Sequence, residues 1–197
     1  HRLFRRQRQM CIRDRLEEVL IEGLGADYAD KLRHFEREPF AAASIGQVHR
    51  LRTRDGRAAV LKIQYPGIRE SIDSDVDNLA SLLSMSGLLP KHMDMAPLLE
   101  EAKTQLHEEA DYEQEARYLK AFVRALGGDE RFLIPRLIPH LSATRILGMT
   151  YVPGIPIEEV SHETAAERSR VLGLLFELLM IELFQLKLVQ TDPNFAN

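Results

Sequence analysis

Apolar residues near the start of the chain recur at the spacing of an α-helix. Over residues 16–24, leucine and valine return every three or four positions, and Gly23 and Gly25 stand at the end, which predicts a helix. A second short helix is expected at residues 28–35. Pro39 then breaks the chain before a run of small residues.

The next two apolar stretches follow the period of a β-strand. Residues 48–53 alternate moderately between apolar and polar, and residues 58–64 form a second stretch with Lys62 inside it. Asp55-Gly56 between them is a strong turn signal. We therefore expect a β-hairpin whose returning strand carries a lysine.

Longer helices are expected in the middle of the chain. Residues 72–83 have a helical pattern. A loop then leads to Asp94, a plausible N-cap for one long helix over residues 97–126. The pair Gly127-Gly128 is a common way for such a helix to end.

The last part of the chain returns to strand and then to helix. Residues 144–152 predict one or two strands, and the Pro-Gly-Ile-Pro sequence of residues 153–156 forms a short connector. Thr164 and Glu167 have the spacing of a capping box for a last helix over residues 165–187. This helix is the most apolar part of the sequence. Its charged residues argue against a membrane span, so we expect it to be buried in a core.

This order of elements predicts an α+β protein with two lobes. Residues 16–152 are expected to form a lobe with a small antiparallel sheet and added helices, and residues 153–156 a hinge. Residues 157–197 would begin a helical lobe that the sequence leaves truncated. The arginine-rich residues 1–15 are expected to be a non-native or disordered basic segment, with the native chain starting near Leu16.

Composition narrows the classes of function. Apolar residues make up 45% of the 197 positions, which is enough for a packed core. Lys and Arg total 26 against 30 Asp and Glu, and the net charge of −4 gives no reason to expect nucleic acid as a partner. Cys11 is the one cysteine, so an internal disulfide is excluded and a reducing compartment is favoured.

Asp192 and Asn197 stand at the end of the chain with four residues between them. Protein kinases use this spacing in the catalytic loop, where the aspartate accepts or orients the proton of the attacking hydroxyl and the asparagine holds Mg²⁺. A proline-containing turn with an asparagine cap would give the same residues.

Lys62 is the second candidate, because an ammonium among the apolar residues of a strand is costly unless it is paired. In kinases such a lysine holds the α- and β-phosphates of ATP and pairs with a glutamate on a helix. An edge-strand lysine that points to solvent is the alternative.

The acidic residues 108–115 supply possible partners for that lysine. Asp111 and Glu115 are four apart and are expected to share one face of the long helix. Because stacked carboxylates repel one another, a cation is expected nearby: Lys62, Mg²⁺ or only a neighbouring basic side chain. A solvated acidic face is the alternative.

The run of small residues before the hairpin occupies the place of a kinase's phosphate-covering loop. Small side chains let the backbone approach phosphates closely, although a tight helix–strand junction is the alternative. Each feature alone is a weak signal, and their order along the chain is what indicates a kinase-like site. The residues of the run are Ala41, Ala42, Ala43 and Ser44.

Four stretches closely resemble the UbiB-like, aarF-domain family of atypical kinases, in the branch of the mitochondrial and proteobacterial coenzyme Q proteins. The resemblance covers residues 17–197 and implies a protein-kinase-like fold. It rests on AAASIGQVH at 41–49, VLKIQYPGI at 60–68, EADYEQEA at 109–116 and QTDPNFAN at 190–197. The roles that it implies are catalytic for Lys62, Glu115 and Asp192, ATP-binding for Ala41, Ala42, Ala43, Ser44 and Lys62, regulatory for Glu109 and Asp111, and metal-binding for Asn197.

The resemblance also implies ATP and Mg²⁺ as cofactors, a weak or conditional ATPase activity, and support of ubiquinone biosynthesis. The implied partners are lipid or quinone intermediates, quinone-biosynthesis enzymes, and a membrane surface contacted by parts outside these residues. The implied location is cytoplasmic and peripheral to a bacterial inner membrane.

Two motifs of the family are missing from the sequence: the K-x-G-Q motif upstream of the alanine segment and the D-F-G motif beyond Asn197. We therefore expect the 197-residue chain to be catalytically inactive even where its parent is active. Two other functions remain open at this point. One is a nucleotide-gated scaffold that transfers no phosphate, and the other is a small-molecule phosphotransferase of the aminoglycoside or choline kinase kind.

Overall fold

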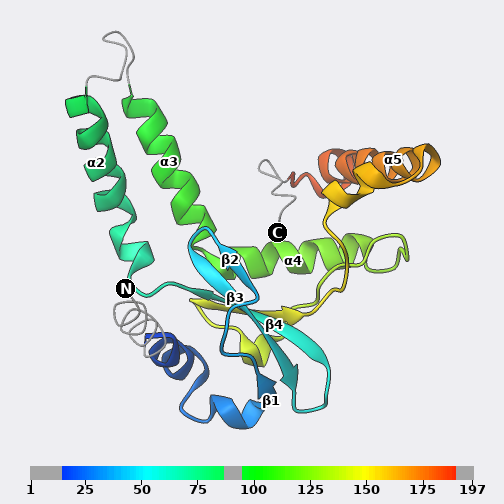
Figure 1. Ribbon diagram of the computed structural model, residues 1–197, viewed down its shortest axis with the longest axis horizontal. Helices are drawn as coiled ribbons and strands as arrows, with labels where there is room; N and C mark the ends of the chain where they lie inside the picture. The colour runs from blue at the N-terminus through cyan, green and yellow to red at the C-terminus, as the bar shows by residue number, and fades with distance from the viewer. Residues whose placement is uncertain (1–14, 87–94, 190–197) are drawn as a thin grey trace. The chain divides into compact units, whose positions relative to one another are not determined.

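The chain divides into two compact units (Figure 1). Unit 1 comprises His1–Arg117 and Leu137–Thr150, and unit 2 comprises Tyr118–Arg136 and Tyr151–Asn197. The structure is a computed structural model, and it describes residues 15–86 and 95–189. The predicted lobe and hinge boundaries stay predictions.

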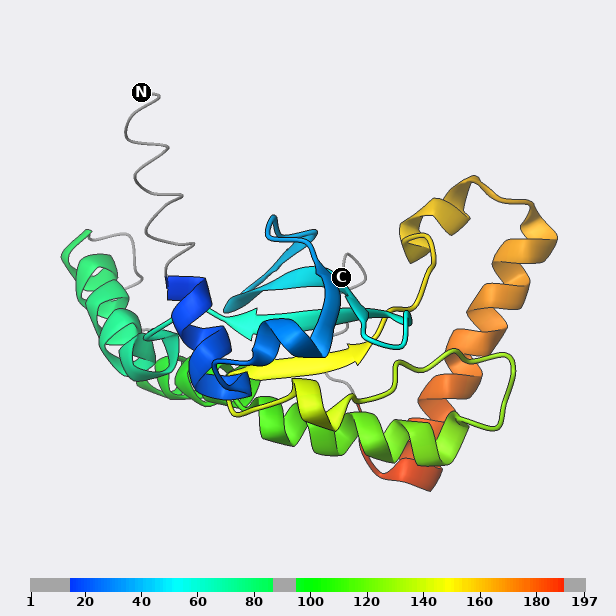
Figure 2. The ribbon, with the colours of Figure 1, turned by 90° about the horizontal axis from the view of Figure 1, so that it is seen from below.

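Unit 1 is built on one antiparallel sheet of five strands, which Figure 2 shows from below. Its strands lie in the order β1-β3-β4-β5, with β2 paired to β3. Their bounds are Leu32–Phe35 for β1, Ala41–Ala43 for β2, Gly46–Thr53 for β3, Ala58–Gln64 for β4 and Ile146–Thr150 for β5. Strand β4 is therefore paired on both sides.

The predicted hairpin is confirmed as β3 and β4. Seven residue pairs join the two strands, from Gly46↔Gln64 to Arg52↔Ala58. Gly56 takes a φ of +86°, which only glycine adopts at little cost, and its N–H donates to the carbonyl of Thr53 at 2.8 Å.

The predicted second helix is wrong over half its length. Only Tyr28–Lys31 form a 3₁₀ turn, and the next four residues are strand β1. The local pattern is overridden by pairing with β3, where Phe35 lies opposite Leu51 and stacks on the ring of His49 with 5.2 Å between centroids.

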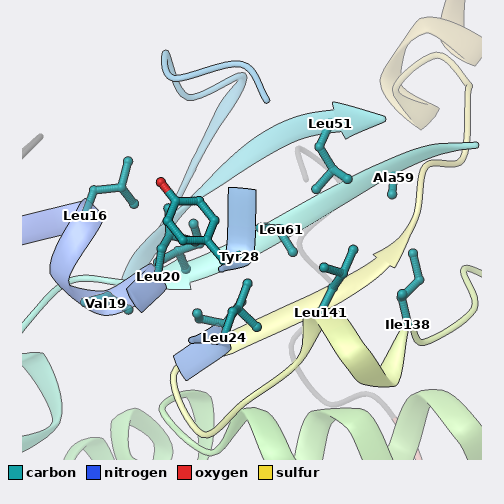
Figure 3. Close-up of a cluster of buried hydrophobic side chains, with 12 residues drawn as sticks. Leu16, Val19, Leu20, Leu24, Tyr28, Leu51, Ala59, Leu61, Ile138 and Leu141 are labelled. Atoms are coloured by element: carbon teal, nitrogen blue, oxygen red, sulfur yellow. The ribbon is translucent and has the colours of Figure 1, made fainter. Parts of the chain in front are cut away.

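One face of the sheet carries the main hydrophobic core (Figure 3). Residues 15–24 form the predicted helix, and Leu20 on it is fully buried. Leu61 and Ile63 from β4 are also fully buried, and so is Leu141 from the 3₁₀ turn Pro139–Leu141. The core is completed by Leu16, Val19, Leu24, Tyr28, Leu51, Ala59, Ile138 and Ile146.

The opposite face packs against three helices of the middle region. They are α2 at Ile68–Ser86, α3 at Ala96–Glu109 and the start of α4 at Tyr112–Leu126. A second cluster of buried side chains joins them to the sheet: Ile45, Ile72, Ala110, Tyr112 and Leu147. Because successive strand residues alternate between faces, β4 serves one core with Leu61 and Ile63 and turns Lys62 and Gln64 to the other.

The prediction of a single helix over residues 97–126 is wrong, because the chain breaks it at Ala110 and Asp111. The Asp111 carboxylate accepts a hydrogen bond from the N–H of Gln114 at 2.8 Å and so caps α4. The buried carbonyl of Ala110 accepts one from the side-chain amide of Gln64 at 2.6 Å. The predicted cap Asp94 lies outside the described residues, and α3 begins at Ala96.

Helices α2 and α3 run side by side as a hairpin (Figure 1), and polar pairs join them. His107 lies 3.1 Å from Asp73, and the Lys103 ammonium lies 2.8 Å from Asp77. Further along α2 the apolar side chains are exposed, with Met85 at 84%.

Unit 2 contains the end of α4, a 3₁₀ segment at Ile157–His162, and helix α5 at Ala165–Ile181, which continues as a π-helical turn at Glu182–Leu186. Thr164 caps α5 by accepting from the N–H of Glu167 at 3.2 Å, which confirms one half of the predicted capping box, while the Glu167 carboxylate accepts from Arg170. The prediction that this apolar helix is buried is wrong within the described residues, where Leu172 is 65% and Phe176 62% exposed.

Within the described part of the chain, no helix combines the length and the apolar character needed to cross a bilayer.

Candidate active site

Lys62 lies in the middle of the sheet, and the alternative of an edge-strand lysine is wrong. Its backbone stands opposite Val48 of β3 on one side and Leu147 of β5 on the other. Its side chain leaves the sheet on the face that packs against α4 and is 23% exposed. The Lys62 side chain is therefore partly and not fully buried.

The Lys62 ammonium is paired with the carboxylate of Glu115, in the first turn of α4. Its Nζ lies 2.8 Å from one carboxylate oxygen and 3.0 Å from the other. The ring of Tyr112 lies one helical turn earlier, with its centroid 4.8 Å from the same nitrogen. The carboxylate and the π-face of the ring together compensate the partial burial of the ammonium.

The acidic segment is divided between two helices, with Glu109 at the end of α3 and with Asp111 and Glu115 at the start of α4, where the N–H of Glu115 donates to the Asp111 carbonyl at 3.0 Å. Asp111 caps α4 and lies 3.8 Å from Arg117, whereas Glu115 turns to Lys62. Glu109 ends α3 and accepts a hydrogen bond from the hydroxyl of Ser44 at 2.5 Å. The two residues of the E-x-D motif thus have different contacts.

The alanine segment is a strand and not the loop that was predicted, and the alternative of a helix–strand junction is also wrong. Ala41, Ala42 and Ala43 pair with Val48, Gln47 and Gly46 of β3. Only Ser44 and Ile45 form the turn of this second hairpin. Extended pairing with β3 fixes the backbone, so the segment is a stiff edge of the sheet beside the Lys62 face.

Sequence reasoning missed the close contact between Gly46, the first residue of β3 in this hairpin, and Tyr112 on α4. A Cβ atom on Gly46 would come within 2.5 Å of the Ile63 carbonyl oxygen and 2.9 Å of the Tyr112 hydroxyl, so no larger residue fits. Burial raises the pKa of the Tyr112 phenol, and the negative charges of Glu115 and Glu109 raise it further. The phenol therefore stays neutral at physiological pH.

Gln64 was also missed, although the signal for it was available. It follows Lys62 by two positions in a strand, so both side chains must lie on one face. A glutamine on the buried face of a central strand needs hydrogen-bond partners, and it finds one at Ala110.

The remaining predicted site residues, Asp192 and Asn197, lie outside the described residues. In the described ranges, no three His, Cys, Asp or Glu side chains gather as metal ligands.

A lysine from a central strand, paired with a glutamate on the helix packed against that strand, defines the class as a protein-kinase-like fold. The sequence matches the ABC1 atypical kinase-like domain over residues 4–197, so the chain belongs to this family.

Similar proteins of known name agree with the family. The chain is 41% identical over 199 residues to the mitochondrial atypical kinase COQ8B of Rattus norvegicus, with all of this chain and 38% of that protein covered. It is 40% identical over 176 residues to the mitochondrial atypical kinase coq-8 of Caenorhabditis elegans, with 89% and 23% covered.

A solved structure shares the fold as well. The complex of Rv3197 with erythromycin from Mycobacterium tuberculosis superposes with a TM-score of 0.76 at 30% identity, covering 94% of this chain and 47% of that one. The chain thus spans less than half the length of each of these three proteins. The predicted fold class and the resemblance to UbiB-like coenzyme Q kinases are confirmed. The family supports an activity of the kinase or ATPase type.

Proposed function

We propose that the protein to which this chain belongs binds Mg-ATP at the Lys62 site and hydrolyses or transfers its terminal phosphate in support of ubiquinone biosynthesis. The observation that carries the proposal is the pair of Lys62 on β4 and Glu115 on α4, which lie 2.8 Å apart in a unit whose sheet is bordered by the alanine strand β2. The mitochondrial COQ8-type relatives support the biosynthetic role.

The residues present fit a nucleotide triphosphate. Lys62 and Glu115 have side chains that are 23% and 38% exposed, so the ammonium is held in place yet open to an anionic ligand. Ala41, Ala42 and Ala43 have no side chain beyond Cβ to keep a phosphate from the backbone of β2.

Each candidate residue has a distinct part in this proposal. Lys62 would bind the α- and β-phosphates, and Glu115 would hold its ammonium toward them. Asp192 would orient the attacking hydroxyl or water, and Asn197 would hold Mg²⁺. Bound Mg²⁺ would offset negative charge on the transferring phosphoryl group. Glu109 and Asp111 would regulate access, Glu109 through its contact with Ser44.

The partners and the location are part of the same proposal. Quinone-biosynthesis enzymes, a lipid or quinone intermediate and a membrane surface reached by other parts of the protein would be the partners. The location would be peripheral to a bacterial inner membrane, whereas both COQ8-type relatives cited above are named as mitochondrial. The inactivity expected of the 197-residue chain by itself stays a prediction.

The test is Mg-ATP binding and ADP release by the full-length protein and its Lys62→Ala variant. We expect binding with slow ADP release in the wild type. The variant should have a Kd at least about tenfold higher, because it loses the cation that contacts phosphate. Lys103→Ala is the matched control, since it removes a lysine paired with Asp77 on α2, away from β4.

The outcomes separate the alternatives. Binding without any ADP release would favour a nucleotide-gated scaffold, and phosphate transfer to an aminoglycoside or choline would favour a small-molecule phosphotransferase. Equal affinity in the wild type and in Lys62→Ala would show that the nucleotide site is not at Lys62.

A further inference from the structure

Strand β4 holds the start of α4 at two points, and only one of them is the Lys62–Glu115 pair. Two residues further along the same face, the Gln64 amide nitrogen donates to the carbonyl oxygen of Ala110 at 2.6 Å. Ala110 is the C-cap that follows α3, two positions before α4 begins. Both contacts join elements of unit 1.

The contact between Gln64 and Ala110 is more deeply buried than the pair of Lys62 and Glu115. Gln64 is 2% exposed and Ala110 0%. The Gln64 Oε1 is buried with no hydrogen-bond partner among the described residues. A buried amide that leaves one atom unsatisfied costs stability compared with an apolar residue of similar size. Packing alone therefore does not explain a glutamine at this position.

The break between α3 and α4 indicates what Gln64 does at this position. Helix α3 ends just before Ala110, and the Asp111 carboxylate caps the next helix. Glu115 follows Ala110 by five residues, which corresponds to about 1.4 helical turns or about 7.5 Å along a helix axis. A shift or rotation at Ala110 is carried by the rigid first turn of α4 to the Glu115 carboxylate.

We infer that Gln64 is a positioning residue, which fixes the α3–α4 break so that Glu115 meets the Lys62 ammonium. This inference rests on the proposed function, because the pair it orients is the proposed phosphate-binding site. Gln64 touches no phosphate itself and acts through α4. Gln64 and Lys62 project from the same face of β4, two residues apart. The Gln64–Ala110 contact therefore sets where α4 begins relative to the Lys62 ammonium.

The test is a double-mutant cycle on Mg-ATP affinity in the full-length protein. Gln64→Leu keeps the volume and removes the amide, and we expect it to raise the Kd roughly tenfold. In a Lys62→Ala background the same change should have almost no further effect, because the pair that it orients is already gone. A purely structural role would lower affinity by the same factor in both backgrounds and would overturn the inference.

Gln47→Leu is the matched control. Gln47 is also buried, at 7%, but it stands opposite Ile63, whose side chain belongs to the core on the other face of the sheet. We expect this change to alter stability without raising the Kd for Mg-ATP. A Kd raised equally by Gln47→Leu and Gln64→Leu would count against a specific role of Gln64.

A measurement without nucleotide separates this inference from the proposed function. Hydrogen exchange at the amides of Gln114 and Glu115, which hydrogen-bond to Asp111, reports whether the first turn of α4 is held in place. We expect faster exchange there in Gln64→Leu and not in Gln47→Leu. If Lys62→Ala leaves the Kd unchanged, the proposed site fails, and this exchange result still decides the role of Gln64: unchanged exchange overturns it.

Discussion

His49 is a fully buried titratable residue on β3, the strand that pairs with the Lys62 strand β4. Its Nδ1 lies 2.9 Å from the carbonyl oxygen of Glu36. Because a carbonyl only accepts, Nδ1 carries a proton in this contact. Its Nε2 is buried with no partner among the described residues, and protonating it would place an unpaired charge in the core.

This burial predicts a pH dependence of stability. Loss of solvation lowers the pKa of His49 below its ordinary value of 6.5, and the Glu36 carbonyl opposes the shift only in part. Between the folded pKa and about pH 6.5, the unfolded chain binds the proton and the folded chain does not. The free energy of unfolding should therefore fall as the pH drops through this window, by up to about 1.4 kcal/mol per pH unit.

The measurement is urea unfolding between pH 5 and pH 7.5 for the wild type and for His49→Leu. We expect the variant to lose the part of the slope below about pH 6.5 that one histidine contributes. His34→Leu on strand β1, where the side chain is exposed, is the control and should keep the slope. Identical slopes in the wild type and His49→Leu would contradict the prediction.

At the scale of single elements, α4 depends on its cap. The Asp111 carboxylate accepts from the N–H of Gln114, and asparagine can accept the same bond. We expect Asp111→Ala to lower the free energy of unfolding by about 1 kcal/mol and Asp111→Asn to change it by only a few tenths. Chemical denaturation of the three proteins measures the difference.

The same pair of variants tests whether the charge of Asp111 regulates nucleotide binding. If Asp111 acts only as a cap, Asp111→Asn should bind Mg-ATP like the wild type. A changed affinity in Asp111→Asn at unchanged stability would show that the charge itself matters, which is the regulatory role predicted from the E-x-D motif.

The hairpin and the lysine strand could be predicted from the sequence because local signals agree there with long-range pairing. Asp55-Gly56 sets the turn, and the apolar pattern of 58–64 suits a strand with neighbours on both sides. Residues 32–35 were wrongly predicted as helix, because their strand depends on pairing with β3, and no local pattern reveals that partner. The break at Ala110 was missed for a similar reason. The carbonyl of Ala110 accepts a hydrogen bond from Gln64 on β4, and this contact cannot be read from the residues around Ala110.

In the candidate site too, some contacts could be predicted from the sequence and others could not. The sequence pattern left the partner of Lys62 open among several acidic residues. The resemblance to the UbiB-like family implied Glu115, and the structure brings these two residues together. The contact between Ser44 and Glu109 joins residues 65 positions apart. No spacing rule predicts such a contact, because it follows from where the sheet places the end of α3. The catalytic roles of these residues stay predictions.

At the scale of the whole molecule, helix α5 carries several apolar side chains that the other described residues leave exposed. Leu172, Phe176 and Leu179 follow the spacing of a single helical face of α5, and each is at least 40% exposed. Leu183, in the π-helical turn that follows, is 43% exposed. A helix that is apolar on this face and largely uncovered is a site of association in water. The chain spans only 38% or less of the COQ8-type relatives cited above, so their remaining length is available to cover such a face.

We therefore predict that the 197-residue chain, produced alone, binds a hydrophobic dye and self-associates at micromolar concentration. The double change Leu172→Glu and Phe176→Glu places two charges on the exposed stripe and should suppress both effects, as seen by dye fluorescence and light scattering. Gln185→Glu adds charge on an exposed position away from the stripe and should leave self-association nearly unchanged. A wild-type chain that stays monomeric and dye-free would show that the α5 stripe is covered in solution.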